Sequence, residues 1–360
     1  MSSTSDTSGW RMPAHSNVEQ VRHRTTLEES VSLPAVLQGS FRLPVMSAPM
    51  FLASGPELVK AQCQAGIIGS FPALNARPTS LLDDWLSEIA EDNAAFARRN
   101  PDATVAPFAV NQIVHRTNTR LEQDMEVIVK HKVPIVITSL GARPEVNEAV
   151  HSYGGIVLHD VIHNRFAQKA VEKGADGLIA VAAGAGGHAG TQSPFALVQE
   201  IRVWFDGPLM LSGAIAHGRS ILAAQAAGAD MAYVGSAFLS TQEANIVPEY
   251  RQMVLDSSAS DVVYSNYFTG IHGNYLRGSI TAAGYDADAL PTPEEGASPA
   301  SARAAGSKAW KDVWGSGQGI GALKETTTVS GLVERFESEY HEAIEQLNQQ
   351  TLSTNTISVS

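Results

Sequence analysis

A histidine surrounded by glycines is the group in this sequence best suited to acid–base chemistry. His188 lies in "AAGAGGHAG", residues 182 to 190. The ordinary pKa of imidazole is near neutral, so a histidine can accept or donate a proton under physiological conditions. Gly186 and Gly187 would let the backbone approach a flat ligand closely. The stretch therefore predicts a ligand site in which His188 is the reactive side chain.

The same stretch also satisfies the spacing of a dinucleotide-binding turn, through Gly184, Gly186 and Ala189. Such a turn normally follows the first strand of its fold and needs an acidic residue at the carboxyl end of the next strand. Here the stretch follows the sixth predicted strand, and the acidic candidate, Asp206, precedes the seventh. The position therefore favours a histidine site over a dinucleotide fingerprint.

Two further glycine-containing turns end later apolar segments. They are "SGAI" (212–215) and "GSAF" (235–238). Backbone N–H groups at such turns, and at the start of a following helix, can bind a phosphate. Gly213, Gly235 and Ser236 are the donors predicted for this role. The alternative is that both are ordinary tight turns.

Other reactive side chains fit chemistry less well. His159, Asp160 and His163 in "HDVIH" resemble metal ligands, but His159 and Asp160 end a predicted strand, and Asp160 is better explained as a polar group at the strand end. Cys63 lies in a predicted helix. Because it is the single cysteine, the chain can form neither a disulfide framework nor a thiolate cluster. No metal site is predicted.

The elements that must position these residues are eight short apolar segments, most of them followed by a helical pattern. They cover residues 45–50, 65–71, 105–111, 133–141, 155–161, 176–183, 208–215 and 231–238. Helical periodicity is clear at 78–99, 118–131 and 218–228. Buried strands that alternate with helices predict a parallel sheet, and eight such units favour an α/β fold of the (β/α)8 TIM-barrel type over an open sheet. In a barrel, the loops that follow the strands share the face where active sites lie.

Two similar phrases support repeated βα units. "KGADGLIAV" (173–181) and "AGADMAYVG" (227–235) each contain the end of a helix, a Gly-Ala-Asp turn and a buried strand. We predict that they occupy equivalent places in the barrel.

The chain outside this pattern predicts further parts. Residues 1–18 and 349–360 are polar and aperiodic, and we predict that they form tails. Between the tails we predict a barrel (19–245), a lid or small excursion (246–325) and a final helix (326–348) that packs on the barrel. The lid region contains aromatic side chains that could either cover a substrate or pack a small subdomain: Tyr264, Tyr267, Phe268, His272 and Tyr275.

The composition of the chain limits the classes of binding partner that it suits. The 25 Lys and Arg against 37 Asp and Glu give a formal net charge of −12, which disfavours nucleic acid and anionic membranes and favours a small-molecule ligand. The chain starts with no secretory pattern and contains no apolar run long enough to span a membrane, and the lone cysteine suits a reducing compartment. We expect a cytoplasmic protein. A homodimer is compatible with the sequence, which does not decide the oligomeric state.

Five motifs in order give the sequence a resemblance to a known family. They are "MSAPM" (46–50), "AGGHAG" (185–190), "SGAI" (212–215), "GSAFL" (235–239) and "GNYLRGSITAAGYD" (273–286). Between about Leu43 and Ala283, the chain resembles the nitronate monooxygenase (2-nitropropane dioxygenase) family of FMN-dependent barrels. The first four motifs lie at or just after the ends of the first, sixth, seventh and eighth predicted strands.

The resemblance implies an FMN molecule across the barrel mouth, with its phosphate on the loops after the seventh and eighth strands. His188 matches the active-site histidine of the family. The resemblance implies the following cofactor-binding residues: Ala48, Pro49 and Met50 at the edge of the isoalloxazine ring, Asn111, Ser139 and Asp160 at strand ends, Gly186 and Gly187 beside the ring, and Ser212, Gly213, Ala214, Gly235 and Ser236 near the phosphate. Many members have a lysine facing the flavin from the central strands, where this sequence has Ser139 and Asp160.

The activity implied is oxidation of alkyl nitronates or nitroalkanes with O2 to a carbonyl compound and nitrite. His188 would then take a proton from the nitroalkane or contact its nitro group. The same resemblance covers NAD(P)H-dependent quinone reductases and enoyl-thioester reductases, which the FMN motifs do not separate from the monooxygenases. A non-catalytic flavin-binding protein is a third alternative, and it predicts that replacement of His188 leaves function intact.

Overall fold

The structure is a computed structural model that describes residues 33–39, 41–291 and 310–355. Contacts divide the chain into residues 1–32 and 33–360, and all described residues belong to the second unit. The predicted tail at 1–18 lies outside the described residues, as does 356–360 at the other end.

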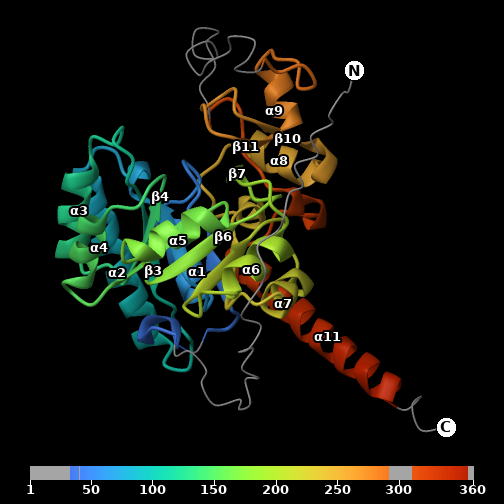
Figure 1. Ribbon diagram of the computed structural model, residues 1–360, viewed down its shortest axis with the longest axis horizontal. Coiled ribbons are helices and arrows are strands. Elements are labelled where there is room, and N and C mark those ends of the chain that lie inside the picture. The colour runs from blue at the N-terminus through green and yellow to red at the C-terminus, as the bar shows by residue number, and fades with distance from the viewer. Residues whose placement is uncertain (1–32, 40, 292–309, 356–360) are drawn as a thin grey trace, which may run out of the picture. The chain divides into compact units, whose positions relative to one another are not determined.

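Eight parallel strands form one sheet in the described part of the chain (Figure 1). The strands are β1 (Val45–Ser47), β2 (Gly69–Pro72), β3 (Phe108–Ile113), β4 (Ile135–Ser139), β5 (Ile156–Val161), β6 (Gly177–Val181), β8 (Leu209–Ser212) and β9 (Met231–Val234). The helices between them are α1 (Pro56–Gln64), α2 (Ser80–Arg99), α3 (Leu121–Lys130), α4 (Pro144–His151), α5 (Asn164–Glu172), α6 (Pro194–Arg202) and α7 (Gly218–Ala226). Each of the eight predicted apolar segments overlaps one of these strands, although β2 and β3 end one and two residues beyond theirs.

The sheet closes on itself between β1 and the start of β2. β1 pairs in parallel with β9 on one side. On the other side Met46 bridges Ile68, and the N–H of Ser47 donates to the carbonyl oxygen of Ile68 at 2.7 Å. Each strand is followed by its helix in a parallel sheet, so the predicted (β/α)8 barrel is confirmed.

Alternation along the strands divides the apolar residues between two layers. On β6, Ile179 lies in the cluster that fills the barrel interior, whereas Leu178 and Ala180 pack in the layer toward the helices. Met46 and Met210 belong to the same interior cluster. The barrel is therefore a packed core, and a ligand site can form only at one of its ends.

The repeated Gly-Ala-Asp turns have equivalent roles, as predicted. Gly174 and Gly228 both have positive φ, +93° and +112°, which ends a helix without the steric cost that a Cβ would bring. Asp176 then accepts from the N–H of Val157 at 2.7 Å, and Asp230 accepts from the N–H of Leu209 at 2.8 Å. Each aspartate thus satisfies a backbone donor at the start of the preceding strand.

The region after β9 contains a second, three-stranded antiparallel sheet. Its order is β10 (Val262–Ser265), β11 (Gly273–Leu276) and β7 (Gly187–His188), and β7 belongs to the glycine-rich loop after β6. The helices α8 (Pro248–Asp256) and α9 (Arg277–Ala282) flank β10 and β11 in the chain. The excursion is therefore hydrogen-bonded into the predicted ligand loop, which the sequence pattern did not indicate.

The final helix, α11 (Val329–Asn355), is longer than the predicted 326–348. Residues 349–355, predicted as tail, are helical, because the polar run that begins at Gln349 contains no glycine or proline to end the helix. Leu332, Val333 and Phe336 of this helix are buried in the outer core layer. Among the helices of the described residues, none combines the length and the apolar composition needed to cross a membrane.

Candidate active site

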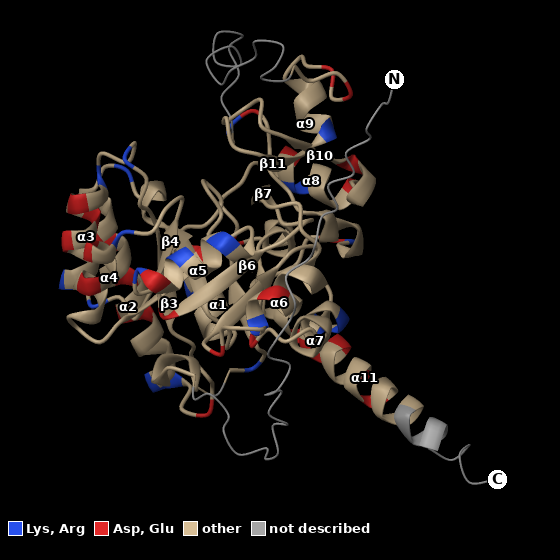
Figure 2. Cartoon of the chain, in the orientation of Figure 1, with Lys and Arg blue, Asp and Glu red and all other residues tan. Residues whose placement is uncertain are grey.

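Polar side chains from several strands gather at the carboxyl ends of the barrel strands. Charged side chains otherwise lie mainly on the surrounding helices (Figure 2). Asp160, near the end of β5, is the single Asp, Glu, Lys or Arg on the eight barrel strands. Asp160, Val181 and the residues Ala48, Pro49 and Met50 after β1 are partly exposed, whereas the strand residues below them are buried. The barrel is thus open to solvent at this mouth.

Three predicted site residues form a hydrogen-bonded chain across β3, β4 and β5. The side-chain amide of Asn111 donates to Ser139 Oγ at 2.6 Å, and Ser139 Oγ donates to Asp160 Oδ2 at 2.6 Å. Burial raises the pKa of Asp160 to about 6, with the hydrogen bond from Ser139 acting in the opposite direction. The pKa of Tyr233 is raised by burial and by the nearby Asp160 charge. This chain offers a ligand both donor and acceptor groups at the mouth.

The other candidate reactive side chains, His159, His163 and Cys63, do not form a site of their own. His159 Nδ1 lies 2.6 Å from Thr138 Oγ1 inside the barrel wall, and His163 caps α5 by accepting from the N–H of Phe166. Within the described residues, no cluster of three or more His, Cys, Asp or Glu side chains is arranged to hold a metal ion. Burial raises the pKa of the Cys63 thiol to about 12, so it is not a nucleophile at neutral pH.

The loops after β8 and β9 present backbone donors at the mouth. Gly213, Gly235 and Ser236 are partly exposed, and their N–H groups donate to no partner within the described residues. The N–H of Ala214 is different, because it donates to the carbonyl oxygen of Gly184 at 3.2 Å. Three of the predicted phosphate donors are thus free within this part of the chain, and the Ala214 N–H is not.

Two glycines are explained by close contacts within the protein. Gly213 has φ of +141°, and a Cβ there would lie 2.7 Å from the carbonyl oxygen of Ala183. A Cβ at Gly186 would lie 2.7 Å from Ser236 Oγ and 2.8 Å from the N of Gly317. The glycine at 186 therefore lets the loops after β6 and β9 meet the segment near 317, a reason that the sequence analysis did not anticipate.

Substitution of Gly186 by alanine is expected to destabilise the protein by about 1–3 kcal/mol, because backbone as well as side chain must shift to admit the methyl group. Urea unfolding measures this change. Gly321→Ala is the matched control, since a Cβ at Gly321 would have its nearest neighbour at 3.8 Å, an ordinary van der Waals distance. Equal stability of the two variants would contradict the packing argument.

His188 is held by the second sheet. As part of β7 it pairs with Gly273 of β11, and its Nε2 lies 3.1 Å from Thr269 Oγ1 in the β10–β11 connection. The indole of Trp310 packs against the imidazole edge, with ring centroids 5.5 Å apart. Burial lowers the pKa of His188 to about 4, so the imidazole is neutral at pH 7 and carries a lone pair. The side chain is only partly buried.

Several residues around the mouth were missed by sequence reasoning. Gly317 N donates to Ser236 Oγ at 2.8 Å, and Gln318 N donates to the carbonyl oxygen of Gly184 at 2.9 Å. Gly319 packs against Ala214 so closely that its Cβ would lie 2.9 Å from the backbone there. The run of small residues in "GSGQGIG" (315–321) was the available signal, because only small residues allow such approach.

The pH dependence of stability provides a test of burial at β5. Burial, and secondarily the charge of Lys173, lowers the pKa of His159 to about 4. Between about pH 6.5 and 4 the unfolded chain therefore binds a proton that the folded chain does not, and the free energy of unfolding falls as the pH falls. His159→Gln should lose about 1–3 kcal/mol of this pH-dependent change, measured by urea unfolding at pH 7, 5.5 and 4.5. His341→Gln, at an exposed position, should retain it. An unchanged slope in the His159 variant would refute the assignment.

Comparison with known families matches residues 37–339 to the family described as nitronate monooxygenase. The chain belongs to the nitronate monooxygenase family. The resemblance drawn from the sequence is thus confirmed, and the match extends beyond the range of about Leu43 to Ala283. The chain is therefore an oxidoreductase of a flavoenzyme family.

Individual relatives are distant. A nitronate monooxygenase of Paraburkholderia phytofirmans is 27% identical over 364 aligned residues, which cover 85% of this chain and 94% of that protein. A Mycobacterium tuberculosis protein is 31% identical, but over 44% of this chain and only 42% of its own length. The fold is similar to FabK from Thermotoga maritima (TM-score 0.69, 24% identity, 88% and 97% of the chains) and to nitroalkane oxidase from Streptomyces ansochromogenes (TM-score 0.66, 24% identity, 85% and 98%).

Proposed function

We propose that this protein is an FMN-dependent nitronate monooxygenase that oxidises small or medium alkyl nitronates, or their parent nitroalkanes, with O2. The products are a carbonyl compound and nitrite. The observation that carries the proposal is His188, a neutral imidazole in the family's glycine-rich motif at the barrel mouth. A carbon acid needs such a base, because a protonated imidazole could not accept its proton.

What supports FMN is the donor set at the mouth. The free N–H groups of Gly213, Gly235 and Ser236 suit a phosphate, which is held well by converging backbone donors. The partly exposed Ala48, Pro49 and Met50 offer an apolar edge for a ring system, and the Asn111–Ser139–Asp160 chain offers polar contacts. These residues fit the cofactor, and bound FMN would supply the electron acceptor that the oxidation requires.

The residues of the chain then remove the proton of the substrate and position the group that accepts it. His188 accepts the α-proton of a nitroalkane, and the electron pair of the broken C–H bond moves to the nitro group to give the nitronate. A substrate supplied as the nitronate does not need this step. Trp310 and Thr269 hold the imidazole from two sides, which limits its orientations. Ser139 and Asp160 stand at the strand ends where many members of the family have a lysine facing the flavin.

The test begins with the visible absorbance of purified protein, followed by O2 uptake with propyl-2-nitronate in the presence and absence of NADH. Flavin absorbance and NADH-independent O2 uptake with nitrite release are expected. Turnover that requires NADH together with a quinone or an enoyl thioester would establish the reductase alternative. Bound flavin without either reaction would favour a non-catalytic flavin-binding protein. A protein that takes up no FMN would contradict all three.

A further inference from the structure

The hydroxyl of Thr269 lies at the centre of a small hydrogen-bonded group that includes the histidine. It donates to the carbonyl oxygen of Ile271 at 2.9 Å and accepts from the N–H of Ile271 at 3.3 Å. His188 Nε2 lies 3.1 Å away, and the hydroxyl of Tyr275 lies 3.4 Å away. Thr269 is thus the side chain through which the β10–β11 connection reaches His188.

The single proton of this hydroxyl decides which imidazole nitrogen carries hydrogen. A hydroxyl donates one hydrogen bond and accepts up to two. The Ile271 carbonyl oxygen can only accept, and its 2.9 Å contact is the shortest that Thr269 Oγ1 makes, so we assign the hydroxyl proton to this bond. With that assignment, the bond to His188 has the imidazole as donor, through Nε2–H. In a neutral imidazole this leaves the lone pair on Nδ1.

We propose that Thr269 is a positioning residue that fixes His188 as the Nε2–H tautomer and makes Nδ1 the atom that accepts the substrate proton. Within the described residues, Nδ1 has no hydrogen-bond partner, whereas Nε2 faces the β10–β11 connection. The α-proton of the nitroalkane is transferred to Nδ1, the C–H electron pair moves to the nitro group, and His188 becomes imidazolium. The inference rests on the proposed function for the substrate and on geometry alone for the tautomer.

The arrangement gives the excursion a role beyond covering the mouth. β11 fixes the backbone of His188 through its pairing with Gly273, and Thr269 fixes the ring. Trp310 packs against the same imidazole, with ring centroids 5.5 Å apart, and Tyr275 packs in turn against Trp310, with ring centroids 5.2 Å apart. Burial raises the pKa of Tyr275 to about 12, so this phenol stays neutral at working pH.

The experiment compares Thr269→Val, which removes the hydroxyl at nearly constant shape, with Thr269→Ser, which keeps it. Long-range ¹H–¹⁵N NMR spectra of flavin-loaded protein at pH 7.5 distinguish the protonated from the lone-pair nitrogen of each imidazole. Signals of His188 are those absent in His188→Asn. We expect Nε2–H in the wild type and in Thr269→Ser, and a shift toward Nδ1–H in Thr269→Val.

Activity provides the second measurement. Thr269→Val should lower kcat/KM for a nitroalkane about tenfold or more, because a wrong tautomer presents N–H where a lone pair is needed. The same variant should change kcat/KM much less for the nitronate, which needs no proton removal, and Thr269→Ser should behave as wild type. Equal losses on both substrates would indicate a merely structural role and overturn the proposal. Detection of the Nδ1–H tautomer in the wild type would also overturn the proposal. Inactivity of the wild type toward both substrates would refute the proposed function, and the NMR result alone would then decide the tautomer.

Discussion

His188→Asn is expected to lower kcat for a nitroalkane by about 10²–10⁴ while flavin stays bound. The range is the usual contribution of a positioned general base. The amide cannot accept a proton at neutral pH, whereas the imidazole of His188 is neutral there because burial lowers its pKa to about 4. Flavin should remain because the proposed phosphate donors at 213, 235 and 236 belong to other loops. Stopped reactions that quantify nitrite measure the loss, and absorbance reports the flavin.

Comparison of the losses on the nitroalkane and the nitronate distinguishes whether His188 acts as a base or only binds the substrate. Loss of proton removal should affect the nitroalkane far more than the corresponding nitronate, since the nitronate is already deprotonated. A histidine that only contacts the nitro group would show similar losses on both substrates and a raised KM. His341→Asn, on an exposed face of α11, is the matched control and should retain full activity with each substrate. Full nitroalkane activity in His188→Asn would contradict the assignment of this histidine.

The sequence predicts the barrel well because its information is local. Each buried strand is mainly apolar, with polar residues toward the carboxyl ends of β3, β4 and β5, and the turns around the strands contain glycine or proline where the backbone requires them. Gly174 and Gly228 illustrate this, since both have positive φ at the end of a helix, and the aspartate two residues after each accepts from a backbone N–H at the start of the preceding strand. The position of His188 at the mouth follows from the strand count alone, because the loop after the sixth predicted strand lies at the carboxyl-end face.

The contacts that hold His188 could not be predicted in the same way. Thr269 is 81 residues from His188 in the chain, and the two meet only because β11 pairs with β7. A two-residue strand such as β7 carries no periodicity, and its glycines indicate a loop. The packing of Gly186 against Gly317 is similar, since small residues permit a close contact without specifying the partner. Pairing between distant segments thus limits what one sequence reveals about this site.

Gly218→Ala is the substitution expected to cost the most stability. Gly218 begins α7 at the place where α7 meets α11, and a Cβ there would lie 2.3 Å from the carbonyl oxygen of Phe336 and 2.3 Å from the N of Tyr340. Both are backbone atoms of a helix, so no side-chain rotation relieves the overlap. Alanine favours a helix over glycine by about 1 kcal/mol. The two helices must nevertheless separate to admit the methyl group, and we expect a net destabilisation of about 3 kcal/mol or more.

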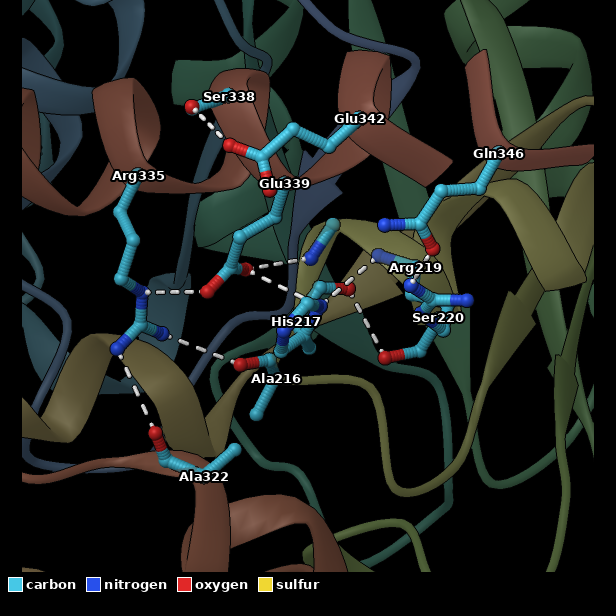
Figure 3. A network of polar contacts seen from close by, with 11 residues as sticks. Ala216, His217, Arg219, Ser220, Ala322, Arg335, Ser338, Glu339, Glu342 and Gln346 are labelled. Carbon is cyan, nitrogen blue, oxygen red and sulfur yellow. Dashed lines mark hydrogen bonds and ion pairs between the residues drawn. The ribbon is translucent and has the colours of Figure 1, made fainter. Parts of the chain in front are cut away.

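The separation would also break a polar network between the helices (Figure 3). Glu339 accepts from the N–H of Gly218 at 2.8 Å and lies 3.3 Å from His217 Nδ1, so its carboxylate sits at the positive end of α7. Arg219 reaches Gln346 from the same turn. Glu339→Gln removes the charge but keeps an acceptor, and should cost about 1 kcal/mol or less. A larger loss in Gly218→Ala than in Glu339→Gln would therefore identify backbone contact as the dominant interaction.

Thermal unfolding and hydrogen exchange distinguish the two ways in which Gly218→Ala can relieve the overlap. If α11 detaches, exchange should accelerate in α11 around Phe336 and Tyr340 while the barrel strands stay protected, because α11 contributes only to the outer core layer. If the helices shift together, the whole barrel should unfold at a lower temperature, since α7 also packs on the layer that contains β8 and β9. Gly321→Ala, where the nearest neighbour of a Cβ would lie 3.8 Å away, should show neither change. Wild-type stability and exchange in Gly218→Ala would mean that α7 and α11 do not approach as closely in solution as their backbone contact requires.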